Sequence, residues 1–223
     1  MTAATKVVVV LSGGQDSTTC LYWALDQFGR DGVTSLTFDY GQRHRIELEC
    51  AKKVAALAGV SNDQLKIDTL RELGGNALTD DSRKVRSDLD PETNLPNTFV
   101  PGRNLIFLTY AAAYAYQRDA HHLVTGVAQT DYSGYPDCRE DTIKALEVAI
   151  RLGMEYDLEI HTPLMHRSKK ETVELAHNLG AMDAMAFTHT CYEGAQPPCG
   201  ECPACKLRAK GFEEAGISDP IFT

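Results

Sequence analysis

The sequence has no apolar run that approaches the length of a membrane span. No separate signal-like region is seen either, because MTAATKVVVVL leads directly into the first predicted strand. Positive charge is scarce, since 22 Lys and Arg residues against 31 Asp and Glu residues give a net charge of −9. This balance argues against a broad electropositive surface for nucleic acid and leaves room only for a local basic patch. We expect a soluble, cytoplasmic protein.

The cysteine pattern lacks the features of a disulfide framework. The total of seven is odd, and four of the seven fall within residues 191–205. Such a distribution is typical of reduced thiols and a metal site. The length of 223 residues suits one domain with a full core and leaves no room for a large second domain.

Residues 6–20, KVVVVLSGGQDSTTC, are the stretch around which the chain is organised. The β-branched run at 7–11 predicts a strand covered on both faces, and residues 18–28 carry apolar side chains at helical spacing. A strand, a glycine turn and a helix in this order favour anion binding, because the helix amides and the positive dipole end point beyond the strand. Phosphate is the expected ligand, although an ordinary strand-to-helix turn has a similar composition.

The residue types in this turn suit phosphate. Gly13 and Gly14 permit close backbone approach and positive φ, and the hydroxyls of Ser12 and Ser17 can donate to phosphate oxygens. The Asp16 carboxylate can cap the helix or hold a magnesium ion, and the sequence does not separate these roles. The turn has neither the Gly-Lys-Ser/Thr ending of a Walker loop nor the third glycine of a dinucleotide fingerprint.

Strands and helices alternate along the rest of the chain. Further strands are predicted at 33–38, 65–67, 123–127 and 158–162, and helices at 46–57, 105–116, 140–152 and 166–178. This alternation predicts an α/β fold with a doubly wound, parallel, five-stranded sheet that binds ligands beyond the carboxyl ends of its strands. Polar segments follow the strands at that edge, at 12–17, 39–44, 130–139 and 166–171. Their convergence predicts the site there, although loops are also polar for solubility.

Residues 74–101 form a polar span that is long for a compact domain. A lid over the site, a dimer contact or a plain flexible insertion would each explain it.

The cysteines near the end of the chain are spaced as C-x7-C-x2-C-x2-C, at Cys191, Cys199, Cys202 and Cys205. Four thiolates suit one tetrahedral zinc ion with a structural role. An iron–sulfur cluster, which also uses four cysteines, is the alternative. Metal binding would fasten residues 188–215 onto the domain, because this segment has too little apolar content to fold alone.

The turn SGGQDS resembles the SGGxDS loop of the PP-loop ATP pyrophosphatases, which cleave ATP between its α and β phosphates. Four further segments extend the likeness over nearly the whole chain: DYGQRH at 39–44, VPGRN at 100–104, DYSGYPDCR at 131–139 and CGECPAC at 199–205. With these segments the chain resembles the QueC family, the 7-cyano-7-deazaguanine synthases.

The resemblance implies an ATP-dependent carbon–nitrogen ligase of queuosine biosynthesis. Members convert 7-carboxy-7-deazaguanine and ammonia to 7-cyano-7-deazaguanine (preQ0) through adenylated intermediates, first of the carboxylate and then of the amide. The resemblance further implies Mg²⁺ with the ATP and a homodimer. Because no glutaminase domain fits in the length, we expect ammonia from solution, and the acidic charge and the lack of long apolar runs predict no direct contact with nucleic acid or membrane. It also implies a nucleotide-binding domain at 1–187 with a four-cysteine zinc-binding segment at 188–223 packed on it.

The resemblance also suggests site residues. ATP would contact the loop and the end of the second strand, at Val10, Leu11, Ser12, Gly13, Gly14, Gln15, Asp16, Ser17, Thr18, Thr19, Cys20 and Asp39. The catalytic set would be Ser12, Asp16, Ser17, Arg103 and Lys169. The base would meet a stacking ring, carboxylates that accept its hydrogens and an arginine for its own carboxylate, drawn from Asp131, Tyr132, Tyr135, Asp137 and Arg139. His44 and His166 are candidate acid–base groups, although a structural histidine is the commoner case.

Two other functions fit parts of the sequence. A PP-loop pyrophosphatase that modifies tRNA directly, by thiolation or lysine attachment, would need a basic surface, which the acidic charge opposes. A zinc-containing binding module with a nucleotide-sensing domain would use the cysteines to bind nucleic acid or a protein. Pyrophosphate release that depends on the small base and ammonia would separate the synthase from both.

Overall fold

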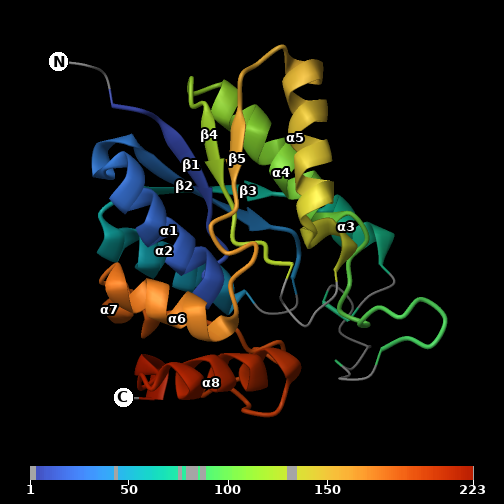
Figure 1. The fold of residues 1–223 in the computed structure, drawn as a ribbon. Helices are drawn as coiled ribbons and strands as arrows, with labels where there is room; N and C mark the ends of the chain where they lie inside the picture. The colour runs from blue at the N-terminus through green and yellow to red at the C-terminus, as the bar shows by residue number, and fades with distance from the viewer. Residues whose placement is uncertain are drawn as a thin grey trace.

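The computed structural model describes residues 4–42, 45–74, 77–78, 85, 89–129 and 135–222. Within these ranges, five parallel strands form one sheet in the order β3-β2-β1-β4-β5 (Figure 1). The strands are β1 Val7–Val10, β2 Val33–Asp39, β3 Ser61–Lys66, β4 His122–Val124 and β5 Glu159–His161. The predicted doubly wound α/β fold is confirmed.

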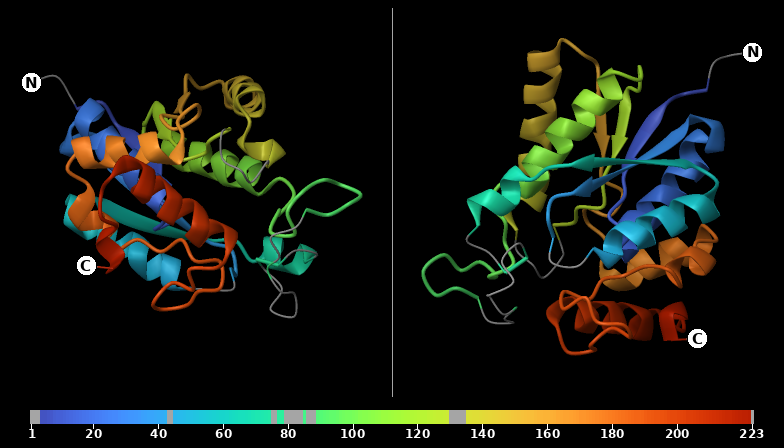
Figure 2. Two further views of the ribbon diagram at one scale, coloured as in Figure 1. Left: turned by 60° about the horizontal axis from the view of Figure 1, so that its bottom comes forward. Right: turned by 180° about the vertical axis from the view of Figure 1, so that it is seen from behind.

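Helices cover both faces of the sheet, with α1 and α2 on one face and α4 and α5 on the other (Figures 1 and 2). Their bounds are α1 Gln15–Phe28, α2 Ile46–Ala58, α3 Thr69–Leu73, α4 Arg103–Tyr116 and α5 Glu140–Met154. Three more follow, α6 Lys169–Asn178, α7 Met182–Met185 and α8 Pro203–Ala215. Helix α8 lies along α6, on the outside of the α1 face (Figure 2, left). Helices α3, α7 and α8 were not predicted.

The central strand β1 explains the unbroken apolar run near the N-terminus. Val7 and Val9 pack into the core on the α1 and α2 face, whereas Val8 points into the core on the α4 and α5 face. All three side chains are at most 1% exposed. Each contributes about 1.5–3 kcal/mol through burial, which favours a strand that is covered on both sides.

The predicted third strand at 65–67 is wrong in its bounds, because β3 spans Ser61–Lys66. Its sequence, SNDQLK, is polar, and most of the strand is exposed at the edge of the sheet. Backbone pairing with β2, not an apolar pattern, defines it. The predicted strands at 123–127 and 158–162 exist but are shorter, since β4 ends at Val124 and β5 at His161.

The polar span at 74–101 falls only partly within the described residues. Its last part, 89–100, projects from the body of the molecule and contains one bridge, between Leu89 and Pro96 (Figure 1). The end of the span is tied down, because Val100 is buried and Thr98 Oγ1 lies 2.6 Å from Tyr135 Oη. A lid or a dimer contact at this span stays a prediction.

No helix in the described part of the chain combines the length and apolar content needed to cross a bilayer.

A buried ion pair ties α8 to the end of the chain. The Arg208 guanidinium makes two hydrogen bonds to the Asp219 carboxylate, from Nε to Oδ2 at 2.6 Å and from Nη2 to Oδ1 at 2.7 Å. Their side chains are 4% and 8% exposed. Arg208 also donates from Nη1 to Thr188 Oγ1 at 2.7 Å, so one side chain connects α8 to the segment that leads to Cys191.

Asp219→Ala is expected to lower the free energy of unfolding by about 3–5 kcal/mol, because it leaves the Arg208 charge buried without its partner. Urea unfolding followed by circular dichroism measures the change. The matched control is Glu214→Ala, which removes the exposed partner of Lys210 on the same helix and should cost at most about 1 kcal/mol. Equal losses in the two variants would contradict the assignment.

Candidate active site

The sheet has one position where the strand order reverses, between β1 and β4. In open parallel sheets, ligands bind beyond the carboxyl ends of the strands at such a position. A cavity of about 300 Å³ lies there, lined by the ends of β1 and β4, the first turn of α1 and residues of α2, α4 and α6. Its size and its mixed polar and apolar lining suit a small-molecule ligand.

The glycine turn after β1 is pressed against α2. Gly13 has a φ of +85°, and a Cβ there would lie 2.3 Å from Glu47 O and 2.8 Å from Ala51 N. Gly126, after β4, faces the first turn of α1, where a Cβ would lie 3.1 Å from Ser17 N. Both glycines therefore serve close approach of backbone segments at the edge of the cavity.

The first turn of α1 is arranged as an anion site. No side chain among the described residues caps this end of the helix, whose N-cap residue is Gly14. The Ser12 and Ser17 hydroxyls lie 3.0 Å apart, and Ser17 Oγ accepts from Ser12 N at 3.1 Å, so the loop fixes both hydroxyls. The uncapped amides and the helix dipole favour a negatively charged ligand.

Two buried polar atoms of this turn lack a partner within the described ranges, Gln15 Nε2 and Asp16 Oδ1. Both residues line the cavity. Because buried polar atoms are nearly always hydrogen-bonded in folded proteins, these two atoms mark positions that a ligand or a bound cation would satisfy.

Asp16 is paired with Lys169, which is the first residue of α6. Lys169 Nζ lies 2.7 Å from Asp16 Oδ2, and the two side chains are 12% and 27% exposed. A capping box between Ser168 and Glu171 fixes the start of α6. Gly211 of α8 packs against Lys169, since a Cβ at position 211 would lie 2.9 Å from Lys169 Cβ. The chain therefore supplies a positioned cation beside the anion site.

A further part of the cavity lining carries Tyr40, Glu47 and Arg103. Burial raises the pKa of Tyr40 to about 12 and that of Glu47 to about 7, in the second case against the opposing charge of Arg103. The Arg103 guanidinium carbon lies 5.9 Å from the centroid of the Tyr40 ring. At neutral pH this lining therefore presents a charged guanidinium, a neutral phenol and a carboxyl group close to its titration midpoint.

The predicted ATP residues differ in their position relative to the cavity. Val10, Leu11, Ser12, Gly14, Gln15, Asp16 and Ser17 line the cavity. Thr18, Thr19 and Cys20 are fully buried and face the protein, where Thr18 donates to Gly14 O, Thr19 to Gln15 O and Cys20 to Thr125 O. Asp39 is the last residue of β2, and its Oδ2 lies 2.5 Å from Arg45 Nη2. Gly13, packed against α2, supports the loop from behind.

The predicted substrate residues are brought together only in part. Tyr135 lines the cavity, and its ring stacks on Phe99 with centroids 5.7 Å apart. Asp137 is 4% exposed and accepts a hydrogen bond from Asn104 N at 2.9 Å, at the N-terminus of α4. Arg139 is exposed at the N-cap position of α5. Asp131 and Tyr132 lie outside the described residues, so their contacts with a base stay predictions.

The two candidate acid–base histidines do not appear in the described lining of the cavity. His166 is exposed and its Nε2 lies 3.3 Å from Glu140 Oε2, which is an ordinary surface contact. His44 lies outside the described residues.

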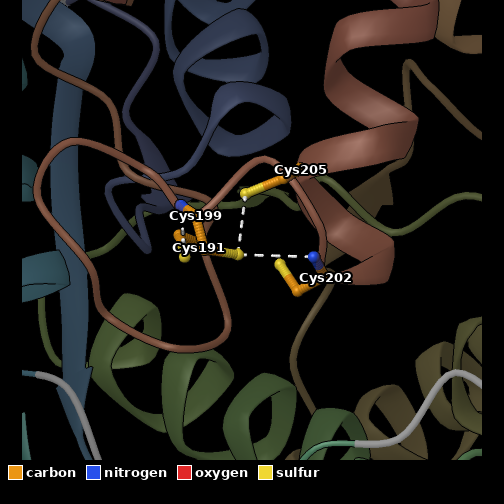
Figure 3. A group of neighbouring side chains, drawn as sticks. All are labelled: Cys191, Cys199, Cys202 and Cys205. Carbon is orange, nitrogen blue, oxygen red and sulfur yellow. Dashed lines mark hydrogen bonds between the residues drawn. The ribbon is translucent and has the colours of Figure 1, made fainter.

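The four C-terminal cysteines converge (Figure 3). All four sulfur atoms lie within 4.8 Å of one another, and Cys199 Sγ is 3.9 Å from Cys205 Sγ. Sulfur atoms around a tetrahedral zinc ion with bonds of about 2.3 Å are separated by about 3.8 Å, so the donor set and its spacing fit this ion. Backbone N–H groups of Cys202 and Glu201 lower the pKa of Cys199 to about 7, which favours the thiolate.

The cysteine cluster is connected to the glycine turn through His189. The backbone N–H of His189 donates to Gly13 O at 2.9 Å, and its Nε2 lies 3.2 Å from Cys191 O. The His189 side chain is buried and lines the cavity. A metal ion held by the cysteines would therefore stabilise one side of the anion site.

A second group of possible ligands, His122, Glu159 and His161, lies on β4 and β5, away from the cavity. His122 Nδ1 is 3.0 Å from His161 Nε2, a distance that a hydrogen bond between the rings explains. Both rings also pack on Phe28, and Glu159 is exposed. This group therefore has an ordinary structural explanation.

Sequence reasoning missed several residues that line the cavity, namely Tyr40, Gln42, Glu47, Asn104, Thr125, Gly126, His189 and Tyr192. A signal for Glu47 was present. Helical periodicity puts position 47 on the same face as Ala51, Val54 and Ala58, which are buried. A carboxylate on an apolar helix face has either a buried partner or a site to serve.

Comparisons with known proteins agree with this geometry. The family described as "Queuosine biosynthesis protein QueC" matches residues 6–216. Two curated relatives are named 7-cyano-7-deazaguanine synthase. The protein of Chromobacterium violaceum is 66% identical over 97% of this chain and 92% of the relative, and that of Bacillus subtilis is 51% identical over 94% of each.

Among solved structures, a predicted subunit of a tRNA methyltransferase from Methanocaldococcus jannaschii is similar in fold. It is 19% identical, with a TM-score of 0.51 over 78% of this chain and 74% of that chain. At this identity the likeness concerns the fold alone. The family match and the relatives together span nearly the whole chain, and we conclude that it belongs to the QueC family of queuosine biosynthesis proteins.

Proposed function

We propose that this protein is a 7-cyano-7-deazaguanine synthase, which uses ATP to convert 7-carboxy-7-deazaguanine and ammonia to the 7-cyano base. The observation that carries the proposal is the anion site after β1, with the Asp16 and Lys169 pair beside it and the cavity in front of it. Relatives that are 50–66% identical are named for this activity. The tRNA-modifying alternative has no comparable support, because the likeness to the tRNA methyltransferase subunit is one of fold.

The chemistry explains why such an enzyme needs a triphosphate site next to a small-molecule pocket. A carboxylate oxygen is a poor leaving group. When it attacks the α-phosphorus of ATP, pyrophosphate leaves and an acyl adenylate forms, from which AMP is a good leaving group. Ammonia then displaces AMP to give the amide. A second adenylation, on the amide oxygen, prepares the elimination that forms the nitrile.

In this proposal the amides of Gly14–Ser17 and the hydroxyls of Ser12 and Ser17 bind the departing pyrophosphate. Lys169 balances charge that develops on the transferred phosphoryl group. The unpartnered Asp16 Oδ1 suits the hard, oxygen-seeking Mg²⁺ that accompanies ATP, and this ion would neutralise the phosphates. Arg103, in the same lining as Tyr40, is available for the substrate carboxylate or a phosphate.

The base has two candidate surfaces in the described lining. Phe38, Tyr40 and Phe107 supply aromatic area close to Arg103, with Phe38 and Phe107 stacked at 4.5 Å between centroids. Tyr135 supplies a second ring, although Phe99 and Thr98 already contact it. Asp131 and Tyr132 remain proposed contacts from the loop after β4.

The cysteine cluster is proposed to hold one zinc ion with a structural role. Four thiolates leave no open coordination position, and bound zinc would cross-link the loop at 191–205 and the start of α8. Iron analysis of the purified protein tests the alternative iron–sulfur cluster. We further propose a cytoplasmic homodimer in which residues 1–187 carry the nucleotide site and 188–223 the zinc segment, with ammonia taken from solution.

The experiment for the proposed function measures pyrophosphate release by the purified protein with ATP and Mg²⁺. Release is expected only when 7-carboxy-7-deazaguanine is present, with the nitrile formed when ammonia is added. Release that requires tRNA would favour a tRNA-modifying enzyme instead. No release under any of these conditions would favour a binding module.

Lys169→Ala is expected to lower kcat about 10²–10³-fold, because it removes a buried cation that faces the transferred phosphoryl group. The matched control is Lys170→Ala, the next residue of the same helix, whose side chain is 47% exposed and pairs with Glu174. The control should retain full activity. Steady-state kinetics of both variants provide the measurement, and a Lys169→Ala enzyme with normal kcat would contradict the assigned role.

A further inference from the structure

The lining of the cavity contains one carboxyl group that the steps above do not use. Glu47, in the first turn of α2, lines the cavity together with Tyr40 and Arg103. Its backbone is held against the ATP loop, because Glu47 O occupies the space in which any Cβ at position 13 would lie, at 2.3 Å. The same contact that shapes the anion site therefore also fixes the backbone that carries this carboxyl group.

The surroundings of Glu47 make it a proton acceptor near neutral pH. Burial raises its pKa to about 7, even though the charge of Arg103 on α4 lowers it. The described titratable groups that interact with it are Tyr40, before α2, and Cys50, one turn further along α2. Burial raises the pKa of both, so both keep their protons at neutral pH. Of these three groups, Glu47 is thus the one that can change its protonation state during turnover.

The reaction removes three protons from the ammonia-derived nitrogen, one in each of three steps. In the first displacement, the nitrogen lone pair of ammonia forms the C–N bond, the C–O bond to AMP breaks, and AMP leaves with the electron pair. The added nitrogen must then lose one proton to become the neutral amide. In the second adenylation, the amide oxygen attacks the α-phosphorus of another ATP, pyrophosphate leaves, and the nitrogen loses a second proton. In the elimination, this adenylate loses its remaining N–H proton while the C–O bond breaks, AMP leaves with the electron pair and the nitrile forms. The displacement and the elimination both need a base within reach of the same nitrogen.

We propose that Glu47 is a catalytic residue that accepts the proton from the ammonia-derived nitrogen in both steps. This inference rests on the proposed function, and it assigns a role to a residue that the sequence did not single out. The neighbouring Arg103 supports it, because a guanidinium beside the carboxylate can hold the carbonyl oxygen or the departing AMP while the proton is transferred. Among the described residues of the lining, Glu47 is the carboxyl group without an ion-pair partner, whereas Asp16 is engaged with Lys169.

The test compares Glu47→Gln with the wild-type protein in three reactions. These are exchange of labelled pyrophosphate into ATP with the substrate acid, capture of the adenylate by hydroxylamine, and turnover with ammonia. The exchange needs no base, and hydroxylamine is a strong nucleophile that is largely unprotonated at neutral pH. Glu47→Gln should lose ammonia-dependent turnover by about 10²–10⁴-fold while the other two reactions stay within about 3-fold. Glu49→Gln, an exposed glutamate of the same helix paired with Lys52, is the control and should retain all three.

The pH profile of kcat gives a second measurement. At saturating ammonia, wild-type turnover should fall as the pH drops through about 7, because the carboxylate becomes protonated, and Glu47→Gln should lack this limb. Normal ammonia turnover in Glu47→Gln, or an equal loss of all three reactions, would overturn the assignment. If the wild-type protein shows no pyrophosphate exchange with the acid, the proposed function fails and this inference with it. Exchange without an effect of Glu47→Gln refutes the inference alone.

Discussion

Gly13→Ala should abolish ATP-dependent turnover and destabilise the fold. Gly13 has a φ of +85°, and the added Cβ would lie 2.3 Å from Glu47 O and 2.8 Å from Ala51 N. These are backbone atoms of α2, so no side chain can move aside. Positive φ costs about 1–3 kcal/mol and overpacking a further 1–3 kcal/mol, which together predict a loss of about 2–6 kcal/mol in the free energy of unfolding. Because the loop can relieve this overlap only by moving away from α2, the anion site would be displaced, and activity should fall at least about 100-fold.

The control for this substitution is Gly216→Ala at the end of α8. Gly216 also has a positive φ, +66°, but a Cβ there meets nothing within 4 Å. Gly216→Ala therefore shares the backbone strain but lacks the steric overlap. We expect it to lower the free energy of unfolding by about 1 kcal/mol and to leave turnover normal. Urea unfolding and steady-state kinetics on both variants separate the two contributions. A Gly13→Ala protein as stable and active as Gly216→Ala would contradict the close packing of the loop on α2.

Cys202→Ser is expected to remove the bound metal and to weaken ATP binding. The sulfur of Cys202 is one of four that converge, whereas a serine hydroxyl is a poor zinc ligand. Cys202 is also the N-cap residue of α8, a position that serine favours, so the substitution spares the helix while it removes the ligand. Metal content should fall from about one zinc ion per chain to almost none. Loss of the metal should loosen the segment around Cys191, which His189 connects to Gly13 O. The ATP affinity should therefore fall when the metal is lost.

Elemental analysis and ATP titration provide the two measurements. The control is Cys50→Ser, which alters a buried thiol outside the cluster and should leave the metal content unchanged. Chelator treatment of the wild-type protein should reproduce the effects of Cys202→Ser. Retention of zinc in this variant would disprove the ligand assignment, and loss of zinc with unchanged ATP affinity would disprove the connection through His189.

The features that could be predicted from the sequence are those that a short run of residue types determines by itself. The valine run of β1 predicts a covered strand, the glycines after it predict a turn, and the cysteine spacing predicts a cluster that could hold a metal ion. Each of these signals is local, and each survives in the fold. The parallel, doubly wound arrangement then followed from the alternation of strands and helices.

The elements that the sequence missed depend on contacts between distant segments. The edge strand β3 is polar and exists through pairing with β2, which no pattern within SNDQLK reveals. Asp137 was a candidate for binding the base, and the fold shows in addition that its carboxylate accepts a hydrogen bond from Asn104 N at the start of α4, which the sequence does not reveal. Glu47 was not singled out from the sequence, and the fold puts it in the cavity lining with Arg103 of α4, where burial raises its pKa. The chemical character of a carboxylate is set by what the fold brings next to it.

The proposed function depends most on where the triphosphate of ATP binds. A crystal structure with an ATP analogue that cannot be cleaved between the α and β phosphates, with Mg²⁺, tests this directly. We expect the β and γ phosphates to lie against the amides of residues 14–17, and the α-phosphorus to face the cavity beside Asp16 and Lys169. Nucleotide bound at another surface, or a glycine turn that stays empty at saturating analogue, would contradict it.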